Sequence, residues 1–503
     1  MHSPALDNEP EQTPEPSAQV RSEASSTITT AAKIALAVLL TAELMNILDD
    51  SIVLTAIPTL QQSLGAGPAA VQWLTAGYAL TFALGLITGG RLGDIFGRRK
   101  IFLLGTAGFT LASLLCGLAA GPGMLIAARV LQGGAAAVMI PQVLATFHVT
   151  FDGENRSRAF GLYGAVLAMG NVLGPVLGGV LTEADLFGLS WRPIFLINVP
   201  IGLAVIILGR KFIIESTARQ ADRLDLAGML LSAIAMVLIV CPLTEGHTNG
   251  WPLWCFAMFA GGLLALGLFL HQQQRKKDAP LVVLSLFKGK EFAGGLSAQL
   301  MVGLLCGLFF MTWTLYLQRG LGMSPLQAAV AFVLLALGEL GGATIAAKTA
   351  GRFARRLPQA GALIALASMT AYGLQVSGGR SDLTLLAMAV PVLLVGFGLG
   401  MIGGPIADLA LAKVPHESAG SASGLFNTAL QLGAAIGVAL TGLVFFAATG
   451  GSADSALNRD AFTGVLWWVG GVLIVMWALM FLLPRHPNSQ ASAARVEAPG
   501  TGR

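Results

Sequence analysis

The sequence predicts an all-α protein that crosses a membrane about fourteen times. The chain is 55% hydrophobic and only 11% charged, so a soluble core could not bury its apolar surface. Apolar stretches of roughly 20 residues, the length that crosses about 30 Å of hydrocarbon, recur along the chain. The loops between them alternate between basic and nearly uncharged. Backbone groups in lipid must hydrogen-bond within their own segment, so we expect these spans to be helices.

The predicted spans have boundaries that are good to about two to four residues. They are 32–56, 71–90, 101–119, 123–146, 158–181, 193–209, 226–243, 253–271, 293–317, 328–350, 360–377, 383–412, 423–447 and 463–483. The sixth span is short, and the twelfth is long enough to tilt or to run past the membrane.

Lysine and arginine predict the orientation, because cytoplasmic loops carry an excess of these residues. The loops after even-numbered spans contain Arg91, Arg98, Arg99, Lys100, Arg210, Lys211, Arg219, Arg223, Arg275, Lys276, Lys277, Lys288, Lys290, Lys348, Arg352, Arg355 and Arg356. The loops after odd-numbered spans contain Arg192, Arg319, Arg380 and Arg459. We therefore expect both termini in the cytoplasm. The net charge of +4 follows from this topology and does not indicate a nucleic-acid partner.

Two short basic loops that contain glycine indicate two related six-helix halves. GRLGDIFGRRK (90–100) follows the second span, and KTAGRFARR (348–356) follows the tenth. The predicted organisation is a disordered cytoplasmic tail at 1–31, a first half at 32–209, an inserted helix pair with its flanking loops at 210–292, a second half at 293–483 and a disordered cytoplasmic tail at 484–503. Such halves are common in secondary transporters, whose substrate sites lie between them.

Several kinds of chemistry have no support in the sequence. No phosphate-binding GxxxxGK[ST] loop occurs, so the energy for transport is expected from an ion gradient or another subunit. The four cysteines lie inside spans without CxxC spacing, which argues against disulfides and zinc. The spans lack HExxH, GxSxG and any His/Asp cluster. We expect no enzyme activity, no metal and no cofactor beyond a proton gradient.

Seven motifs resemble those of the major facilitator superfamily, and in particular its fourteen-span drug:proton antiporters. They are LDDSIVLTAIP (48–58), GRLGDIFGRR (90–99), RVLQGGAAA (129–137), GNVLGPVLGG (170–179), WRPIFLINVPIG (191–202), YLQRGLGMSP (316–325) and GSASGLFNTALQLGAAIG (420–437). The resemblance covers residues 32–483. It implies the major facilitator fold, with two six-helix halves around a central cavity plus the inserted pair, and a functional monomer.

The loop signature after the second span combines glycines with opposite charges. Gly90, Gly93 and Gly97 permit a tight turn and close helix approach. Asp94 lies in sequence near Arg98 and Arg99, so it can form charge-assisted bonds that break and re-form between conformations. The resemblance implies a cytoplasmic latch. The alternative is a basic loop that only fixes the topology.

The motif in the fifth span places small residues along one helix face. Gly170, Gly174, Gly178 and Gly179 favour close packing, and Pro175 favours a bend. The resemblance implies an antiporter motif that seals the bundle against leak. The alternative is ordinary packing of small residues.

Charged residues inside spans are candidate proton-coupling sites, because each is costly in lipid. Asp49 matches the acidic position of the first-span motif, and Asp50 points about 100° away from it. Glu43 lies on nearly the same face as Asp50. Arg129 requires a carboxylate or a water-filled cavity, and the resemblance gives it a role in proton coupling. Glu339 is a candidate in the second half. The alternative for each residue is a structural contact.

Deep polar and aromatic side chains are candidates for the substrate cavity. We expect Tyr78, Gln132 and Trp313 to line it, although Trp and Tyr near span ends are more often interfacial anchors. The first-span motif departs from the family, since Leu54 stands where Asn is expected and Ser51 where Thr is common. The missing amide leaves open whether the substrate range of relatives applies.

The function that these features predict is proton-coupled antiport. The protein is expected to export small lipophilic drugs or antibiotics, cationic or neutral, across a bacterial inner (plasma) membrane by alternating access. Its expected partners are the small-molecule substrate, protons and the lipid bilayer. One alternative is an uptake symporter for a nutrient, which GNVLGPVLGG argues against. Another is a non-transporting sensor or scaffold, which would not need charges inside the membrane.

Overall fold

The computed structural model describes residues 29–151, 153–217, 224–276, 280–378, 384–414, 419–452 and 454–484. Within these ranges, fourteen helical segments are long and apolar enough to cross a membrane, which confirms the predicted membrane class. Nearly all of both predicted disordered tails lies outside the described residues, as do the loop residues Arg219, Arg223, Lys277 and Arg380.

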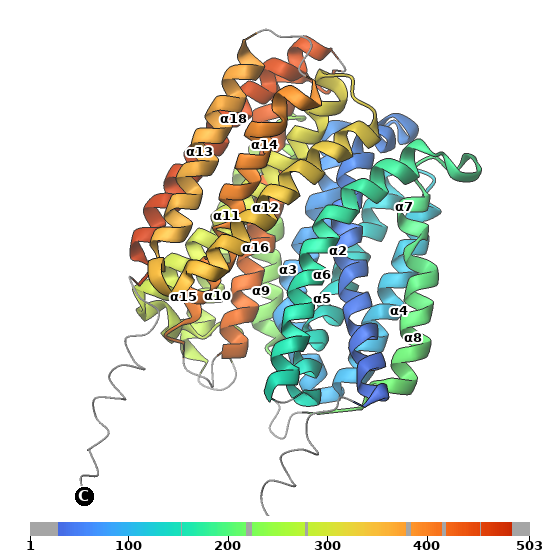
Figure 1. Ribbon diagram of the computed structural model, residues 1–503, viewed down its shortest axis with the longest axis vertical. Helices are drawn as coiled ribbons and strands as arrows, with labels where there is room; N and C mark the ends of the chain where they lie inside the picture. The colour runs from blue at the N-terminus through green and yellow to red at the C-terminus, as the bar shows by residue number, and fades with distance from the viewer. Residues whose placement is uncertain are drawn as a thin grey trace, which may run out of the picture.

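The helices follow the chain in two large groups with a pair between them (Figure 1). The first group is α2 (Thr30–Leu64), α3 (Pro68–Phe96), α4 (Arg98–Gly117), α5 (Pro122–Thr150), α6 (Gly153–Glu183), η1 (Leu186–Gly188), α7 (Pro193–Leu196) and α8 (Asn198–Phe212). The pair is α9 (Leu226–Glu245) and α10 (Leu253–Arg275), followed by η2 (Leu284–Lys288). The last group is α11 (Lys290–Leu315), η3 (Tyr316–Gly320), α12 (Pro325–Phe353), α13 (Arg356–Ser377), α14 (Leu385–Gly400), α15 (Gly403–Leu411), α16 (Ala419–Thr441), η5 (Gly442–Phe446), α17 (Ala447–Thr449), α18 (Ser455–Leu479) and η6 (Met480–Leu482).

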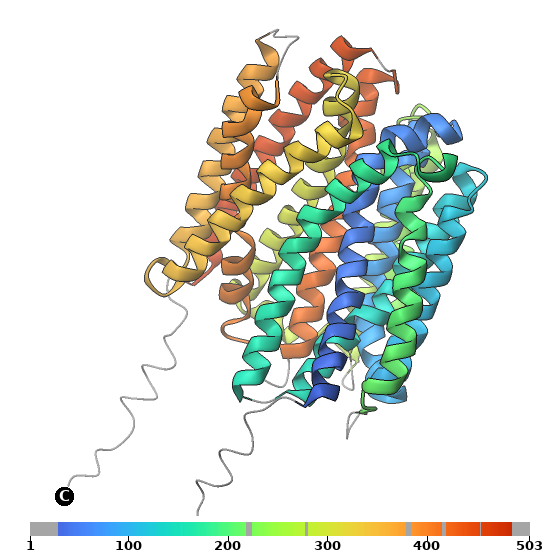
Figure 2. The ribbon, with the colours of Figure 1, turned by 45° about the vertical axis from the view of Figure 1, so that its right-hand side comes forward.

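The first and last groups repeat one pattern of helix contacts. In the first, α2 packs on α6 and α8, α3 packs on α5, and α4 packs on α5 and α8. In the last, α11 packs on α16 and α18, α12 packs on α14, and α13 packs on α14 and α18. The groups are therefore two six-helix halves. They meet where α3 packs on α16 and where α6 packs on α12, and Figure 2 shows α6 and α12 side by side.

The inserted pair lies against the junction of the halves. Helix α9 packs on α10 and also contacts α3 and α16, one helix from each half. At one end of α9, the Trp73 indole N–H donates to Glu245 Oε1 at 2.9 Å. In the most apolar 18-residue windows of α9 and α10, only 22% of residues are buried, the lowest share among the spans of the described chain. Most of the surface of this pair is therefore available to lipid.

The structure revises several predicted boundaries. Helix α2 begins at Thr30 and continues past the predicted end to Leu64. Ile57 and Leu60 stay buried in this extension, and the helix ends where Gly65 adopts a left-handed conformation at φ 61°. The sixth span breaks between α7 and α8, where Pro200 has no N–H for the Leu196 carbonyl. The twelfth span breaks between α14 and α15, where Pro405 has the same effect.

The alternating direction of the spans gives the bundle two different ends. The loops and helix ends that carry Arg98, Lys211, Arg275 and Arg355 share one end, here called the basic face. Because the number of spans is even, the start of α2 and the end of η6 also lie at the basic face.

Candidate functional site

A fully buried ion pair lies inside the first half. Asp49 on α2 is 1% exposed and Arg129 on α5 is 0% exposed. Arg129 Nη1 donates to Asp49 Oδ2 at 2.5 Å, and Arg129 Nε donates to the Leu74 carbonyl at 3.1 Å. The guanidinium carbon lies 4.2 Å from the centre of the Tyr78 ring. A charge removed from water this completely needs a compensating partner, and the structure brings together the two residues that the sequence proposed.

Three uncharged side chains complete the cluster around Asp49. Gln132 Nε2 donates to Asp49 Oδ1 at 2.7 Å, and Asn198 Nδ2 donates to the same oxygen at 2.6 Å. Gln132 Oε1 accepts from Arg129 Nη1 at 2.8 Å. The Ser113 hydroxyl oxygen accepts from Gln132 Nε2 at 2.8 Å. The Asp49 carboxylate therefore joins α2 to α5 and α8, and Ser113 connects α4 to the same cluster through Gln132.

The sequence did not single out Asn198 or Ser113. Asn198 lies within WRPIFLINVPIG, where an amide inside an apolar span is a detectable signal, because an unpaired polar group in lipid is costly. Ser113 carries a weaker signal, because serine is common at helix contacts in membranes. Its hydroxyl also donates to the Phe109 carbonyl at 2.8 Å, so it bonds in both directions.

Binding of a proton to Asp49 would change the hydrogen bonds of this cluster. The Asp49 carboxylate accepts from Arg129, Gln132 and Asn198, and a proton would replace one accepted bond and remove the charge that balances the guanidinium. Arg129 Nη2 is buried and has no hydrogen-bond partner among the described residues, so the guanidinium has one donor to spare. Protonation of Asp49 would change the bonds that hold four helices together.

The other predicted carboxylates make no hydrogen bond to this cluster among the described residues. Asp50 is partly exposed and lies within electrostatic range of Arg129 and Asp49. Glu43 is buried near Tyr163, and its Oε2 atom has no hydrogen-bond partner among the described residues. Glu339 is partly exposed on α12 in the second half. The proton-coupling roles of these three residues stay predictions.

The predicted cavity residues fall in two places. The Tyr78 hydroxyl donates to Asn46 Oδ1 at 2.6 Å, beside the ion pair, and Gln132 is part of the cluster itself. Trp313 lies in the second half, where its indole N–H donates to the Tyr372 hydroxyl at 3.1 Å. All three predicted residues are buried in this structure, and their role in a substrate cavity stays a prediction.

The loop signature forms an ion pair and receives an unpredicted partner. Arg98 Nη2 lies 2.8 Å from Asp94 Oδ1. Glu215, from the segment after α8, accepts the backbone N–H of Arg99 at 3.0 Å and lies 3.7 Å from its guanidinium. Gly97 has φ 102°, and a Cβ there would lie 2.7 Å from Glu215 Oε1. Glycine at this position thus allows Glu215 to cap α4.

The first glycine of the signature has a different role from the one predicted. Gly90 lies inside α3, away from the turn, and a Cβ there would sit 3.8 Å from Pro141, an ordinary contact. The close approach occurs at Gly93, where a Cβ would fall 1.8 Å from Gln142 Oε1. The turn itself depends on Gly97.

The glycine motif of α6 packs closely against α2. A Cβ on Gly174 would lie 1.8 Å from Ser51 Oγ. Thr55 Oγ1 donates to the Pro175 carbonyl at 3.4 Å. Serine at position 51, where the family more often has threonine, keeps this contact small. The glycines that face α2 are Gly170, Gly174 and Gly178.

The next residue of the motif faces the other half. A Cβ on Gly179 would lie 2.8 Å from the Pro325 carbonyl oxygen at the start of α12. Near this contact, the Ser324 hydroxyl donates to Glu183 Oε2 at 2.8 Å. The motif therefore helps to hold the halves together at the face opposite the basic face.

A second set of contacts joins the halves at the same face. Gln318 Nε2 donates to the Thr55 carbonyl at 2.7 Å, and Arg319 Nη2 donates to Gln61 Oε1 at 2.5 Å. Gln318 and Arg319 belong to the π-helical turn η3, and Thr55 and Gln61 belong to α2. These four residues are here called the polar seal.

Comparisons with known proteins agree with this architecture. The family model for the Major Facilitator Superfamily matches residues 39–438. The chain is 38% identical to the probable actinorhodin transporter of Streptomyces coelicolor, over 85% of this chain and 75% of that protein. It is 36% identical to the cephamycin export protein CmcT of Amycolatopsis lactamdurans, over 94% of this chain and 95% of that protein. It is 38% identical to the puromycin resistance protein pur8 of Streptomyces alboniger, over 82% of each chain.

Solved structures show the same fold at lower sequence identity. A bacterial homologue of the human lysosomal transporter Spinster, in an inward-facing and occupied conformation, superposes with a TM-score of 0.66 at 16% identity, over 91% of this chain and 97% of that one. A D-xylose–proton symporter superposes with a TM-score of 0.63 at 14% identity, over 91% of this chain and 99% of that one. The motifs, the paired halves and these matches together place the chain in the Major Facilitator Superfamily, among its antibiotic export and resistance transporters.

Proposed function

We propose that this protein is a proton-coupled antiporter that exports small lipophilic antibiotics or related drugs across a bacterial inner membrane. The observation that carries the proposal is the buried Asp49–Arg129 pair, which belongs to a hydrogen-bonded cluster of side chains from four helices inside one half of a transporter. Support for the substrate class comes from the relatives, which are described as handling actinorhodin, cephamycin and puromycin.

Coupling requires the proton to bind one conformation of the transporter more tightly than another. Protonation of Asp49 removes the charge that balances Arg129 and weakens bonds between α2 and α5. The two protonation states therefore favour different arrangements of these helices. Asp50, Glu43 and Glu339 are further candidates to carry protons or to attract cationic substrates. The proton gradient supplies the energy, and no cofactor is required.

The proposed orientation places the basic face in the cytoplasm, as the distribution of lysine and arginine favours. The polar seal and the Gly179–Pro325 contact then close the outer side of the bundle. This arrangement corresponds to an inward-facing state. Export would require these outer contacts to separate.

The test is transport by the full chain in proteoliposomes with an imposed pH gradient. We expect the gradient to drive uptake or release of a fluorescent lipophilic drug, and Asp49→Asn to abolish the gradient-driven part. Asp454→Asn is a matched control, because Asp454 is an exposed helix cap and asparagine also caps helices well. A flux that ignores the gradient, together with unchanged transport by Asp49→Asn, would exclude the mechanism.

Drug susceptibility provides a second readout. In a host that lacks its own efflux pumps, expression of the wild-type chain should raise resistance to several lipophilic antibiotics, whereas Asp49→Asn should not. Equal amounts of both proteins in the membrane fraction must be shown. Accumulation of a nutrient without resistance to any drug would instead favour the uptake symporter.

A further inference from the structure

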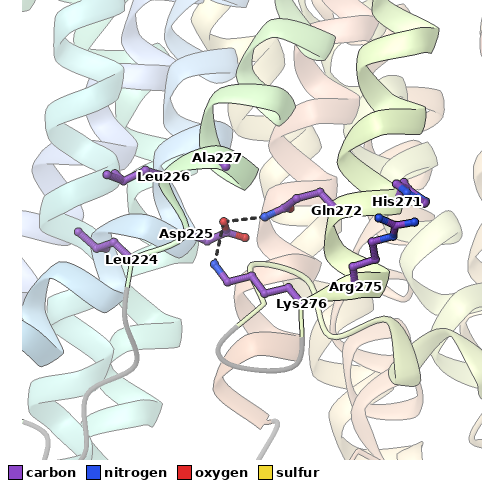
Figure 3. Close-up of a pocket in the computed structure, with 8 residues that line it drawn as sticks. All are labelled: Leu224, Asp225, Leu226, Ala227, His271, Gln272, Arg275 and Lys276. Atoms are coloured by element: carbon purple, nitrogen blue, oxygen red, sulfur yellow. Dashed lines mark hydrogen bonds and ion pairs between the residues drawn. The ribbon is translucent and has the colours of Figure 1, made fainter.

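We propose that the ends of α9 and α10 at the basic face form a binding site for one anionic phospholipid. A pocket of about 580 Å³ opens there between the two helices (Figure 3). It belongs to the inserted pair and is separate from the Asp49 cluster. The residues that line it are Leu224, Asp225, Leu226, Ala227, His271, Gln272, Arg275 and Lys276.

The acidic residue in the pocket is already satisfied by the protein. Asp225 accepts from the Gly228 backbone N–H at 3.0 Å, from Gln272 at 3.0 Å and from Gln273 at 2.6 Å, and Lys276 Nζ lies 2.9 Å from its Oδ1. Burial alone would raise the pKa of Asp225, but these donors outweigh it and hold the pKa below its usual range. Asp225 therefore connects the start of α9 to the end of α10 through its hydrogen bonds and ion pair.

A cation in the pocket remains available to a ligand. Arg275 is exposed at the last turn of α10, and no partner of its guanidinium is found among the described residues. His271 lies one turn earlier, beside it in Figure 3. A guanidinium presents a planar set of donors that matches phosphate oxygens. These groups favour a phosphodiester anion.

An exposed apolar stripe on α10 leads to this cation. Leu268, His271 and Arg275 follow Leu264 by four, seven and eleven residues. These spacings place all four side chains on one face of the helix. Leu264 is 67% exposed and Leu268 is 49% exposed. The stripe changes from apolar to basic at the end of the membrane span, as the surface of a phospholipid changes from acyl chain to headgroup.

A second stripe on α9 reaches the pocket from its other wall. Leu226, Leu230 and Ile234 recur every four residues and are 66%, 63% and 41% exposed. Leu226 also lines the pocket. Two apolar stripes that end at one basic pocket fit a ligand with two acyl chains and one anionic headgroup. A free phosphate ion would contact the basic pocket and leave the stripes unused.

The test is lipid retention by the purified full chain, measured by native mass spectrometry with phosphatidylglycerol and phosphatidylcholine offered at equal concentration. We expect preferential retention of phosphatidylglycerol. Arg275→Ala should lower its affinity about fivefold, the contribution of one cation near an anionic membrane surface. Arg275→Lys should keep most of the affinity. Leu268→Gln should weaken binding through the apolar stripe.

Arg210→Ala is the matched control, because Arg210 is an exposed arginine in the last turn of α8 at the same face. Unchanged phosphatidylglycerol affinity in Arg210→Ala supports a defined site. Equal losses in Arg210→Ala and Arg275→Ala would show general surface attraction and overturn the proposal. Equal retention of phosphatidylcholine would also overturn it, as would displacement by inorganic phosphate combined with no effect of Leu268→Gln.

Discussion

Neutralising Asp49 should destabilise the protein as well as uncouple it. Asp49→Asn keeps one carbonyl oxygen, which can still accept from Gln132 and Asn198. The new amide group would face Arg129 Nη1, a donor 2.5 Å from the present carboxylate oxygen. Breaking a buried pair by removing one partner costs about 3–5 kcal/mol, because the remaining charge stays buried without compensation. We expect a loss of stability of that size.

Removing both charges should restore most of this stability. In the variant Asp49→Asn with Arg129→Gln, no uncompensated charge remains, and the amides can bond with each other and with Gln132. A buried pair contributes little net stability when both charges are removed together, because the cost of desolvating them is removed as well. Gradient-driven transport should be absent in the single and the double variant alike, because neither retains a carboxylate at position 49.

Two assays separate these effects. Unfolding in detergent, followed by tryptophan fluorescence, should show that the wild type and the double variant are more stable than Asp49→Asn. Transport in proteoliposomes should show activity for the wild type alone. The reasoning is refuted if Asp49→Asn is as stable as the wild type, or if the double variant is less stable than both single variants. Retained coupling in a stable Asp49→Asn would move the proton site elsewhere.

Three further predictions follow from other contacts. Gly174→Ala places a Cβ 1.8 Å from Ser51 Oγ and should destabilise the protein by about 1–3 kcal/mol, and Ser51→Gly should recover part of this in thermal unfolding. Arg319→Ala weakens the polar seal and should raise the labelling rate of a cysteine placed at Leu64 about tenfold, whereas an unchanged rate would argue against a gate there. Asp225 has a lowered pKa in the folded state, so its stabilising contribution is present above about pH 4 and is lost as the pH falls further, a dependence that Asp225→Asn should remove in unfolding measured between acidic and neutral pH.

The candidate site could be predicted from the sequence only in part. Asp49 and Arg129 stand out because a charge within an apolar span is rare and costly, and each therefore needs a partner. Asn198 was not predicted, although an amide inside an apolar span is a signal. Ser113 and Glu215 did not stand out, because serine is common at helix contacts in membranes and acidic residues are common in loops. Their importance depends on which atoms they meet: 149 residues separate Asn198 from Asp49, 19 separate Ser113 from Gln132, and 116 separate Glu215 from Arg99.

The sequence by itself determined the number and approximate extent of the spans, because hydropathy depends on the local composition of each segment. It also indicated the family and, separately, the two charged residues that form the buried pair. Only the tertiary structure decided how that pair is bonded, that Gly93 and Gly97 rather than Gly90 make the close contacts, and that the halves are joined at the face opposite the basic face. These features depend on the rotation and depth of one helix against another, which side-chain packing over the whole bundle sets and no single segment encodes.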